Sequence, residues 1–268
     1  MTPSDEVVAE GGSRSARARA ADLRARAADL RARAADLRAC AVDPRACAVK
    51  ICGVTTASDA RRCAELGADL IGLNFHPPSP RCLSEERARA LREVIGDRAL
   101  VVGVFVDHGV EEALAIAGRV GLDLLQFHGV QDLDELAPVA ECSIVVLRAD
   151  DERRCERLVA GGFWGALFDA PAVRGARGEV LFGGTGKPWE YERIRPIADA
   201  GGDATRLLVA GGIDAGNAAR ALSIPGIWGI DVCSGVESSP GHKDHHELER
   251  LFAVARSKRA AATAALGG

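Results

Sequence analysis

The chain has 268 residues, of which 47% are hydrophobic and 27% charged, and its formal net charge is −4. This length suits one large α/β domain or two small ones with a sizeable core, and the composition excludes a disordered chain. The lack of a basic excess argues against nucleic acid as a partner, and no apolar run approaches the ~20 residues that cross a bilayer.

The chain carries eight cysteines, and their spacing argues against a disulfide framework or a metal site. No two of them form a CxxC pair, and no Cys/His cluster has the spacing of a zinc finger. We therefore predict reduced thiols, no bound metal and no cofactor.

The N-terminus lacks the apolar core of a secretory signal, and it carries acidic residues that transit peptides avoid. These features predict a cytoplasmic protein.

Residues 1–46 contain a repeat of Arg, Ala, Asp and Leu. Leu23, Leu30 and Leu37 recur every seven residues, each with Ala three positions before it, which is a coiled-coil pattern in outline. One interpretation is a docking or oligomerising helix. The other, which we favour, is a low-complexity extension that is helical but has no function, because alanine at every a position buries little area. Pro44 cannot continue a helix, so we place the boundary near residue 46.

Between residues 47 and 260, apolar runs alternate with amphipathic segments. The runs are continuously hydrophobic, as strands buried on both faces require. We predict eight strands, at Ala48–Cys52, Leu70–Phe75, Leu100–Val106, Leu124–Phe127, Ile144–Leu147, Trp164–Phe168, Leu207–Ala210 and Ile227–Val232.

The segments between these strands have the apolar spacing of helices. For one of them we predict an N-cap at Ser84, an apolar stripe from Ala88 to Ile95 and a stop at Gly96. Eight strand–helix units predict a single (β/α)8 barrel. A doubly wound sheet is the alternative, but the chain lacks the nucleotide-binding fingerprint of that fold. Residues 261–268 are predicted to form an Ala- and Gly-rich tail.

A barrel of this kind has its active site at the carboxyl ends of its strands. The residues at those positions are a thiol, carboxylates, cations and glycines, which predict acid/base chemistry on a small anionic substrate. In chain order they are Cys52, Arg81, Asp107, His128, Arg148, Asp169, the glycines after Ala210 and the segment from Asp231 to Gly235.

The loops after the last two strands predict a phosphate site. Gly211 and Gly212 follow the seventh strand and precede a helix expected near Asp214, while Ser234 and Gly235 follow the eighth. Glycines let backbone N–H groups approach an anion, and a helix N-terminus favours negative charge. Either loop alone could be an ordinary tight turn, but the two together favour phosphate binding.

An ordered set of motifs resembles the phosphoribosylanthranilate isomerase family. It covers residues 48 to about 255, with one motif at nearly every strand. The motifs are Val49-Lys50-Ile51-Cys52-Gly53-Val54-Thr55, Ser79-Pro80-Arg81, Val102-Gly103-Val104-Phe105, Leu125-Gln126-Phe127-His128-Gly129, Gly183-Gly184-Thr185-Gly186, Ala210-Gly211-Gly212, Asp231-Val232-Cys233-Ser234-Gly235-Val236-Glu237 and Gly241-His242-Lys243-Asp244.

This resemblance implies an Amadori rearrangement in tryptophan biosynthesis. N-(5-phosphoribosyl)anthranilate opens to a Schiff base and becomes 1-(2-carboxyphenylamino)-1-deoxyribulose 5-phosphate. Cys52 matches the general base of the family and Asp169 its general acid. A thiol of pKa ~8.5 needs a nearby cation such as Lys50 to act as a base at neutral pH. Asp169 must hold a proton, so we expect its pKa to be raised by burial or by a carboxylate such as Asp231.

The remaining candidate residues are expected to bind the substrate. Arg81 is predicted to hold the anthranilate carboxylate, since a guanidinium pairs bidentately with such a group. Asp231 is predicted to contact the substrate, whereas His128 is either a substrate contact or a structural histidine. The expected partner is this small phosphosugar alone, with no nucleic acid and no membrane, and the protein is expected to be a monomer or a homodimer.

The sequence departs from the family pattern at three positions. Asn74 and His76 stand where the family more often has an aromatic or apolar residue, and Cys233 replaces a small hydroxyl residue. The stretch 170–182 is predicted to form a flap over the site, with Arg174 and Arg177 as possible contacts. Three further histidines are predicted to line a solvated helix face rather than a metal site, namely His242, His245 and His246.

Two other functions compete with this one. A related barrel isomerase of histidine biosynthesis, or a dual-substrate enzyme, shares the plan but resembles this chain less, because it carries Asp where Cys52 stands. A non-catalytic phosphosugar-binding barrel is the second alternative. It would need neither Cys52 nor Asp169, so the presence of both argues against it.

Overall fold

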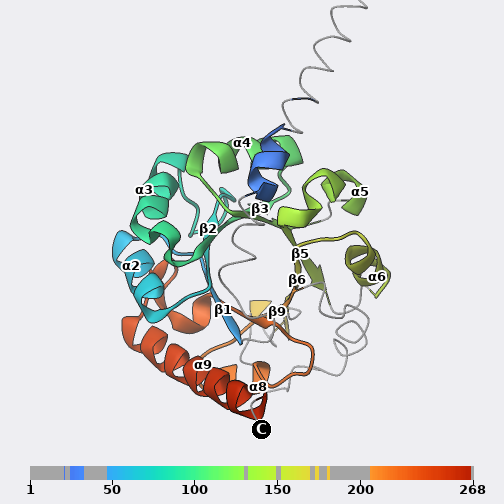
Figure 1. The fold of residues 1–268 in the computed structure, drawn as a ribbon. Coiled ribbons are helices and arrows are strands. Elements are labelled where there is room, and N and C mark those ends of the chain that lie inside the picture. The colour runs from blue at the N-terminus through green and yellow to red at the C-terminus, as the bar shows by residue number, and fades with distance from the viewer. Residues whose placement is uncertain are drawn as a thin grey trace, which may run out of the picture.

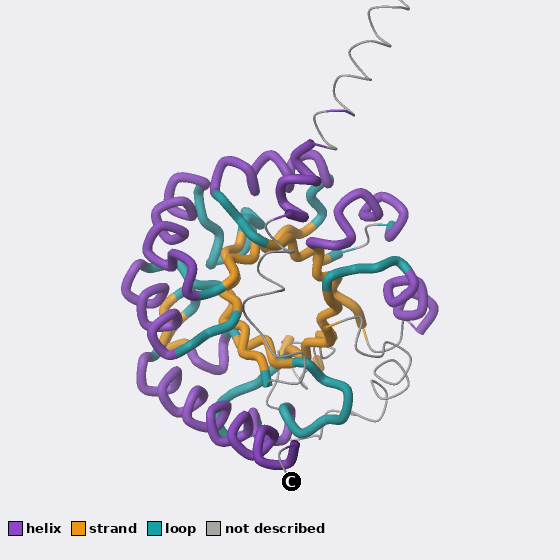
Figure 2. Tube along the Cα trace, in the orientation of Figure 1, coloured by secondary structure: helices purple, strands orange, loops and turns teal. Residues whose placement is uncertain are grey.

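Eight parallel strands close into a barrel in the order β1-β10-β9-β6-β5-β4-β3-β2. The computed structural model describes residues 21, 25–32, 47–129, 132–148, 152–169, 173–174, 180–181 and 206–266. Figures 1 and 2 show the strands as an inner ring with helices around it. The predicted (β/α)8 barrel is confirmed.

The barrel strands lie within two residues of their predicted bounds. They are β1 (Ala48–Cys52), β2 (Leu70–Asn74), β3 (Leu100–Val106), β4 (Leu124–His128), β5 (Ser143–Arg148), β6 (Gly165–Asp169), β9 (Arg206–Ala210) and β10 (Gly229–Val232). Two small antiparallel pairs lie outside the barrel, β7 (Val173–Arg174) with β8 (Val180–Leu181) and β11 (Glu237–Ser239) with β12 (His242–Lys243).

The helices of the outer ring alternate with these strands. The α-helices are α2 (Ala57–Leu66), α3 (Glu85–Ile95), α4 (Val110–Val120), α5 (Leu133–Leu136), α6 (Glu152–Ala160), α8 (Ala218–Ala221) and α9 (His245–Leu266). Short 3-10 helices lie at η1 (Gly96–Arg98), η2 (Ala137–Cys142) and η5 (Ser234–Val236). Within the described residues, no helix is long and apolar enough to span a membrane.

Local sequence signals determine where α3 begins and ends. The hydroxyl of Ser84 accepts a hydrogen bond from the Arg87 backbone N–H, and Gly96 ends the helix with a positive φ of 59°. The N-cap satisfies one of the otherwise unpaired N–H groups of the first turn. The buried side is the predicted stripe, which includes Ala88, Leu91 and Ile95.

A sequence echo before β2 and β4 has the same structural role in both places. Gly67 and Gly121 end their helices in the left-handed conformation. Asp69 and Asp123 follow two residues later, and each carboxylate accepts a backbone N–H of a neighbouring strand. The distances are 2.7 Å from Val49 N to Asp69 and 2.8 Å from Val101 N to Asp123. These bonds join adjacent strands at the amino end of the barrel.

The strand register separates an apolar face from a polar one. Residues directly opposite each other, and residues two apart on a strand, share a face. The face that carries Val49 and Ile51 is apolar around the barrel except at Ser143, whose hydroxyl bonds the Val139 carbonyl, so this face packs against the helices. The opposite face, which lines the interior, carries the polar residues. It includes Lys50, Cys52, Gln126, His128, Asp169 and Asp231.

Part of the N-terminal repeat packs on the barrel. Residues 25–32 are helical, and Figure 1 draws this segment in blue in front of the part of the barrel where α4 and β3 are labelled. Ala27 and Leu30 are only 1% and 5% exposed and belong to the hydrophobic core. The two are one Ala/Leu unit of the heptad, so its apolar side is buried. At the other end of the chain, α9 continues through the boundary expected at residue 260 to Leu266.

Candidate active site

The predicted chemical groups gather at the carboxyl end of the barrel. Cys52, His128 and Asp169 are the last residues of β1, β4 and β6, and Asp231 lies in β10. By register, all four share the inner face. Cys52 and Asp169 are partly exposed, and His128 is exposed. Strands β1 and β6 are separated by β9 and β10 on one side of the barrel, so Cys52 and Asp169 face a common opening.

Lys50 and Asp231 form a buried ion pair below Cys52. Lys50 is 0% exposed, and its Nζ lies 2.9 Å from Oδ1 of Asp231. Burial by itself would lower the pKa of Lys50, but the charges of Asp231 and Cys52 outweigh it and raise this pKa. Lys50 is therefore a fixed positive charge in the barrel interior. Asp231, expected from sequence to contact the substrate, has Lys50 as its partner here.

The Cys52 thiol lies in surroundings that favour its ionised form. A hydrogen bond from Cys233 lowers the pKa of Cys52, and the ammonium groups of Lys50 and Lys243 lower it further, against the opposing effects of burial and of Asp231. The result is a pKa of about 7. The sequence predicted the contribution of Lys50, and the structure adds Cys233 as the larger one. Conversely, the hydrogen bond with Cys52, burial and the Cys52 charge raise the pKa of Cys233.

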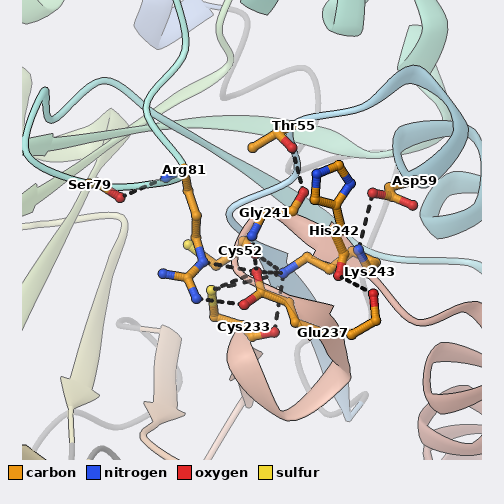
Figure 3. A network of polar contacts seen from close by, with 11 residues as sticks. Cys52, Thr55, Asp59, Ser79, Arg81, Cys233, Glu237, Gly241, His242 and Lys243 are labelled. Atoms are coloured by element: carbon orange, nitrogen blue, oxygen red, sulfur yellow. Dashed lines mark hydrogen bonds and ion pairs between the residues drawn. The ribbon is translucent and has the colours of Figure 1, made fainter.

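Arg81, Glu237 and Lys243 form a polar network beside the two thiols (Figure 3). Arg81 donates from Nε and Nη2 to the two carboxylate oxygens of Glu237, at 2.9 and 2.5 Å. Lys243 donates to the same carboxylate at 2.9 Å. Burial alone would raise the pKa of Glu237, but these two cations hold that pKa below its usual value. Glu237 therefore stays ionised and orients the Arg81 side chain.

Lys243 also joins the ends of the first and last barrel strands. Its Nζ donates to the carbonyl oxygens of Cys52 and Cys233, at 2.6 and 3.1 Å. Its backbone N–H donates to Asp59, whose carboxylate also contacts His245 at 2.8 Å. This buried ammonium therefore sets the relative position of the two cysteines. His245 has Asp59 as a partner, and the described residues contain no group of three or more metal-ligating side chains.

The loops after β9 and β10 lie against each other. Gly211 and Gly212 have positive φ angles of 94° and 61°, which L side chains rarely adopt. A Cβ at Gly235 would collide with the carbonyl oxygen of Ile213. Ser234 and Gly235 form η5 directly above this contact. The predicted phosphate-binding residues are thus brought together, at the positions that barrels use for phosphate.

The helix after β9 starts later than predicted. The sequence suggested a start near Asp214, but α8 begins at Ala218. The Asp214 carboxylate instead accepts the backbone N–H groups of Gly216 and Asn217 at 2.8 and 3.1 Å. An Asp side chain that bonds its own following backbone forms a turn in place of the first helical turn.

Three contributors to the site were not assigned roles from the sequence. Glu237 and Lys243 are charged residues within the quoted motifs, which was the only signal available for them. Cys233 was noted only as a departure from the small hydroxyl residue of the family, and its sulfur contacts Glu237 at 3.8 Å and Lys243 at 3.9 Å. The glycines at 183–186, Arg177 and the side chains of Arg148 and Arg174 lie outside the described part of the chain.

Comparisons with known proteins agree with this geometry. Residues 49–254 match the family model of N-(5'-phosphoribosyl)anthranilate isomerase. An enzyme of that name from Acidithiobacillus ferrooxidans is 34% identical over 210 residues, which is 78% of this chain and 97% of the relative. The phosphoribosylanthranilate isomerase structure from Thermotoga maritima is 31% identical, with a TM-score of 0.68, and the match covers 79% of this chain and 99% of that one.

A second solved structure adds a ligand. It is a phosphoribosylanthranilate isomerase in complex with reduced 1-(o-carboxyphenylamino)-1-deoxyribulose 5-phosphate. It is 30% identical to this chain, with a TM-score of 0.66, and the match covers 79% of this chain and 99% of that one.

Proposed function

Because the chain belongs to the N-(5'-phosphoribosyl)anthranilate isomerase family, we propose that Cys52 and Asp169 move the protons of its Amadori rearrangement. The chain is an isomerase of tryptophan biosynthesis. Its reaction converts N-(5-phosphoribosyl)anthranilate into 1-(2-carboxyphenylamino)-1-deoxyribulose 5-phosphate. The chemistry needs one group that gives a proton and one that takes a proton.

Asp169 acts first, as a general acid. It donates its proton to the furanose oxygen, the bond from that oxygen to C1 breaks, and the ring opens to a protonated Schiff base. Its position at the end of β6, on the inner face and partly exposed, supports this role. A positioned acid of this kind accelerates a proton transfer by about 10²–10⁴-fold.

Cys52 acts second, as a general base. Its thiolate takes the proton from C2, and the electron pair moves toward the iminium nitrogen to give an enol-amine, which becomes the aminoketose. The observation that carries the proposal is the pair of cations, Lys50 and Lys243, whose charges favour a thiolate at this strand end. A thiolate, unlike a thiol, can accept a proton.

The substrate is proposed to be held at both ends. Arg81 binds the anthranilate carboxylate through the donors on Nη1, because its Nε and Nη2 bond Glu237. The phosphate binds backbone N–H groups of the two loops that contain Gly211, Gly212, Ser234 and Gly235. Asp231 acts from beneath the sugar together with Lys50, and His128 contacts the substrate from β4.

The test is the loss of phosphoribosylanthranilate fluorescence with the purified full chain. We expect kcat/KM to fall by about 10²–10⁴-fold in both Cys52→Ala and Asp169→Asn. Matched controls are Cys47→Ala, which removes a thiol just before the other end of β1, and Asp123→Asn, which changes a carboxylate at the amino end. Both controls are expected to keep full activity. Full activity in Cys52→Ala would contradict the proposed base.

We also propose a cytoplasmic location, where a catalytic thiol stays reduced. The six described cysteines are free, which supports a reducing compartment. The assembly is proposed to be a monomer or a homodimer, and sedimentation of the full chain distinguishes the two.

A further inference from the structure

The catalytic thiol has a second thiol directly beside it. Strands β1 and β10 are parallel neighbours with Ile51 opposite Val232, so Cys52 and Cys233 each follow that pair by one residue. The interaction between the two thiols lowers the pKa of Cys52 and raises that of Cys233, and Figure 3 shows the two residues together next to Lys243. Paired strands lie about 4.8 Å apart, and both cysteines directly follow the last paired residues, so the separation of about 4.4–6.8 Å between the Cα atoms of a disulfide is within reach of this pair.

The surroundings of the pair favour reaction with a small oxidant. Both residues are partly exposed, whereas Cys63 and Cys142 are buried. The ammonium groups of Lys50 and Lys243 favour the thiolate of Cys52, and Lys243 Nζ also lies 3.9 Å from the Cys233 sulfur. Cysteines that sense oxidants combine thiolate character, access and a neighbouring thiol that resolves the first product. The pKa of Cys233 is raised by its interaction with Cys52, by burial and by the Cys52 charge, and the contributions of the Cys52 thiolate end once Cys52 is oxidised to a sulfenic acid.

We propose that Cys52 and Cys233 are a hydroperoxide-sensitive pair that closes to a disulfide and reversibly stops the isomerase. The Cys52 thiolate attacks one oxygen of hydrogen peroxide, breaks the O–O bond and becomes a sulfenic acid, while the departing hydroxide takes a proton to give water. The Cys233 sulfur then attacks the Cys52 sulfur, loses its proton and expels a second water. Two thiols are oxidised and one peroxide is reduced to two waters.

Closure removes the group that accepts the C2 proton. The disulfide sulfur carries no negative charge, so it cannot act as a base. This loss of activity rests on the proposed role of Cys52, whereas formation of the disulfide does not. A dithiol reductant restores both thiols by thiol–disulfide exchange. Cys233 stands where the family resemblance calls for a small hydroxyl residue, which could not form this bond.

The test treats the purified full chain with hydrogen peroxide, followed by a non-reducing digest and mass spectrometry. We expect a linked pair of peptides that contain Cys52 and Cys233, with a mass lower by two hydrogens than their sum. Activity is expected to fall on the order of a hundredfold, as for loss of a general base, and to return with dithiothreitol. Each variant is compared with its own untreated activity.

Two variants separate the pair from general thiol damage. Cys47→Ser, which removes another partly buried thiol, is expected to keep the linked peptide and the recovery. Cys233→Ser is expected to form no linked peptide, and its recovery is expected to fail after long exposure, because an unresolved sulfenic acid oxidises further and irreversibly. Equal recovery in Cys233→Ser, or inactivation without the linked peptide, would overturn the proposal.

The two proposals fail in different ways. A linked peptide in a chain that keeps full activity would contradict the base role of Cys52 and the switch, while leaving the disulfide itself established. An untreated chain without isomerase activity would contradict the proposed chemistry and the switch, whereas the linked peptide could still be measured and would decide whether the disulfide forms.

Discussion

Carboxylates with cation partners lie at both ends of the barrel, but what else depends on them differs. At the amino end, Asp69 and Asp123 pair with Arg259 and Arg92, and each also accepts a backbone N–H of a neighbouring strand. At the carboxyl end, Asp231 and Glu237 bind side-chain cations, Lys50 for the first and Arg81 with Lys243 for the second. The residue type is the same at each end, but the amino-end carboxylates also hold backbone groups of adjacent strands, whereas the carboxyl-end carboxylates hold the cations that surround the Cys52 thiol.

This difference separates stability from chemistry. A carboxylate that satisfies a backbone N–H joins two strands, and its loss leaves a buried donor unpaired. A carboxylate that orients a cation determines where positive charge lies relative to Cys52, and so determines the protonation state of the thiol. The position of a polar residue along a barrel strand therefore indicates which of the two roles it has.

The largest expected effect is at Lys50. Lys50→Met leaves the buried Asp231 carboxylate without its cation, and we expect the free energy of unfolding to fall by about 3–5 kcal/mol. The double variant Lys50→Met/Asp231→Leu removes both charges, so its stability is expected to approach that of the parent. Its kcat/KM is expected to stay low, because the cation beneath Cys52 is absent. Denaturant unfolding and the fluorescence assay provide the two measurements.

The kcat/KM of the double variant tests whether the carboxylates at the two ends of the barrel have different roles. If kcat/KM returned to the parental value together with stability, the Lys50–Asp231 pair would be structural, and the carboxyl end would not differ from the amino end in this respect.

The pH dependence of kcat/KM gives the next effect. With a Cys52 pKa of about 7, the reactive thiolate is lost as the pH falls, so the rate is expected to drop tenfold per unit below that value. At about pH 5 this amounts to roughly a hundredfold loss relative to the plateau. Cys233→Ala removes the hydrogen bond that lowers this pKa most, so the acid limb is expected to move to higher pH. A limb at the same pH would mean that Cys233 does not support the thiolate.

A smaller effect is expected at the amino end. Asp123→Ala leaves the Val101 N–H without its acceptor, which costs about 1–3 kcal/mol of unfolding free energy. Asp123→Asn keeps an oxygen acceptor and is expected to lose less. Neither change is expected to alter kcat/KM below the unfolding transition, because Asp123 lies at the opposite end from Cys52 and Asp169. A drop in kcat/KM in the folded Asp123→Ala protein would contradict the separation of roles.

The sequence predicted features that depend on local chain chemistry. Continuous apolar runs located all eight barrel strands, and Ser84 with Gly96 located the ends of α3. The strand-end rule predicted that Cys52, His128 and Asp169 lie at one end of the molecule, and the structure has them there. These predictions succeeded because periodicity, capping and barrel topology do not depend on contacts between side chains that are far apart in the sequence.

Features that depend on contacts between residues far apart in the chain could not be predicted from the sequence. Arg81 and Glu237 are 156 positions apart, and no local pattern shows that these two charges meet. Cys52 and Cys233 become neighbours only because β1 closes the barrel against β10. The predicted start of α8 was wrong for a local reason. The Asp214 side chain accepts backbone N–H groups that would otherwise belong to the first turn of the helix.

The N-terminal repeat belongs to neither end of this comparison, and its removal is expected to have the smallest effect. Deletion of residues 1–46 exposes the surface beneath Ala27 and Leu30, which are 1% and 5% exposed. Burial of a leucine contributes at most about 1.5–3 kcal/mol, and the conformational entropy lost when the segment becomes ordered opposes this gain. We therefore expect stability to change by less than about 1 kcal/mol and kcat/KM to stay within about twofold, since no residue of 25–32 is among the strand-end groups. A large loss of kcat/KM in the folded, truncated chain would show instead that the repeat supports the site, and Leu30→Ser in the full chain would then test whether its buried face is responsible.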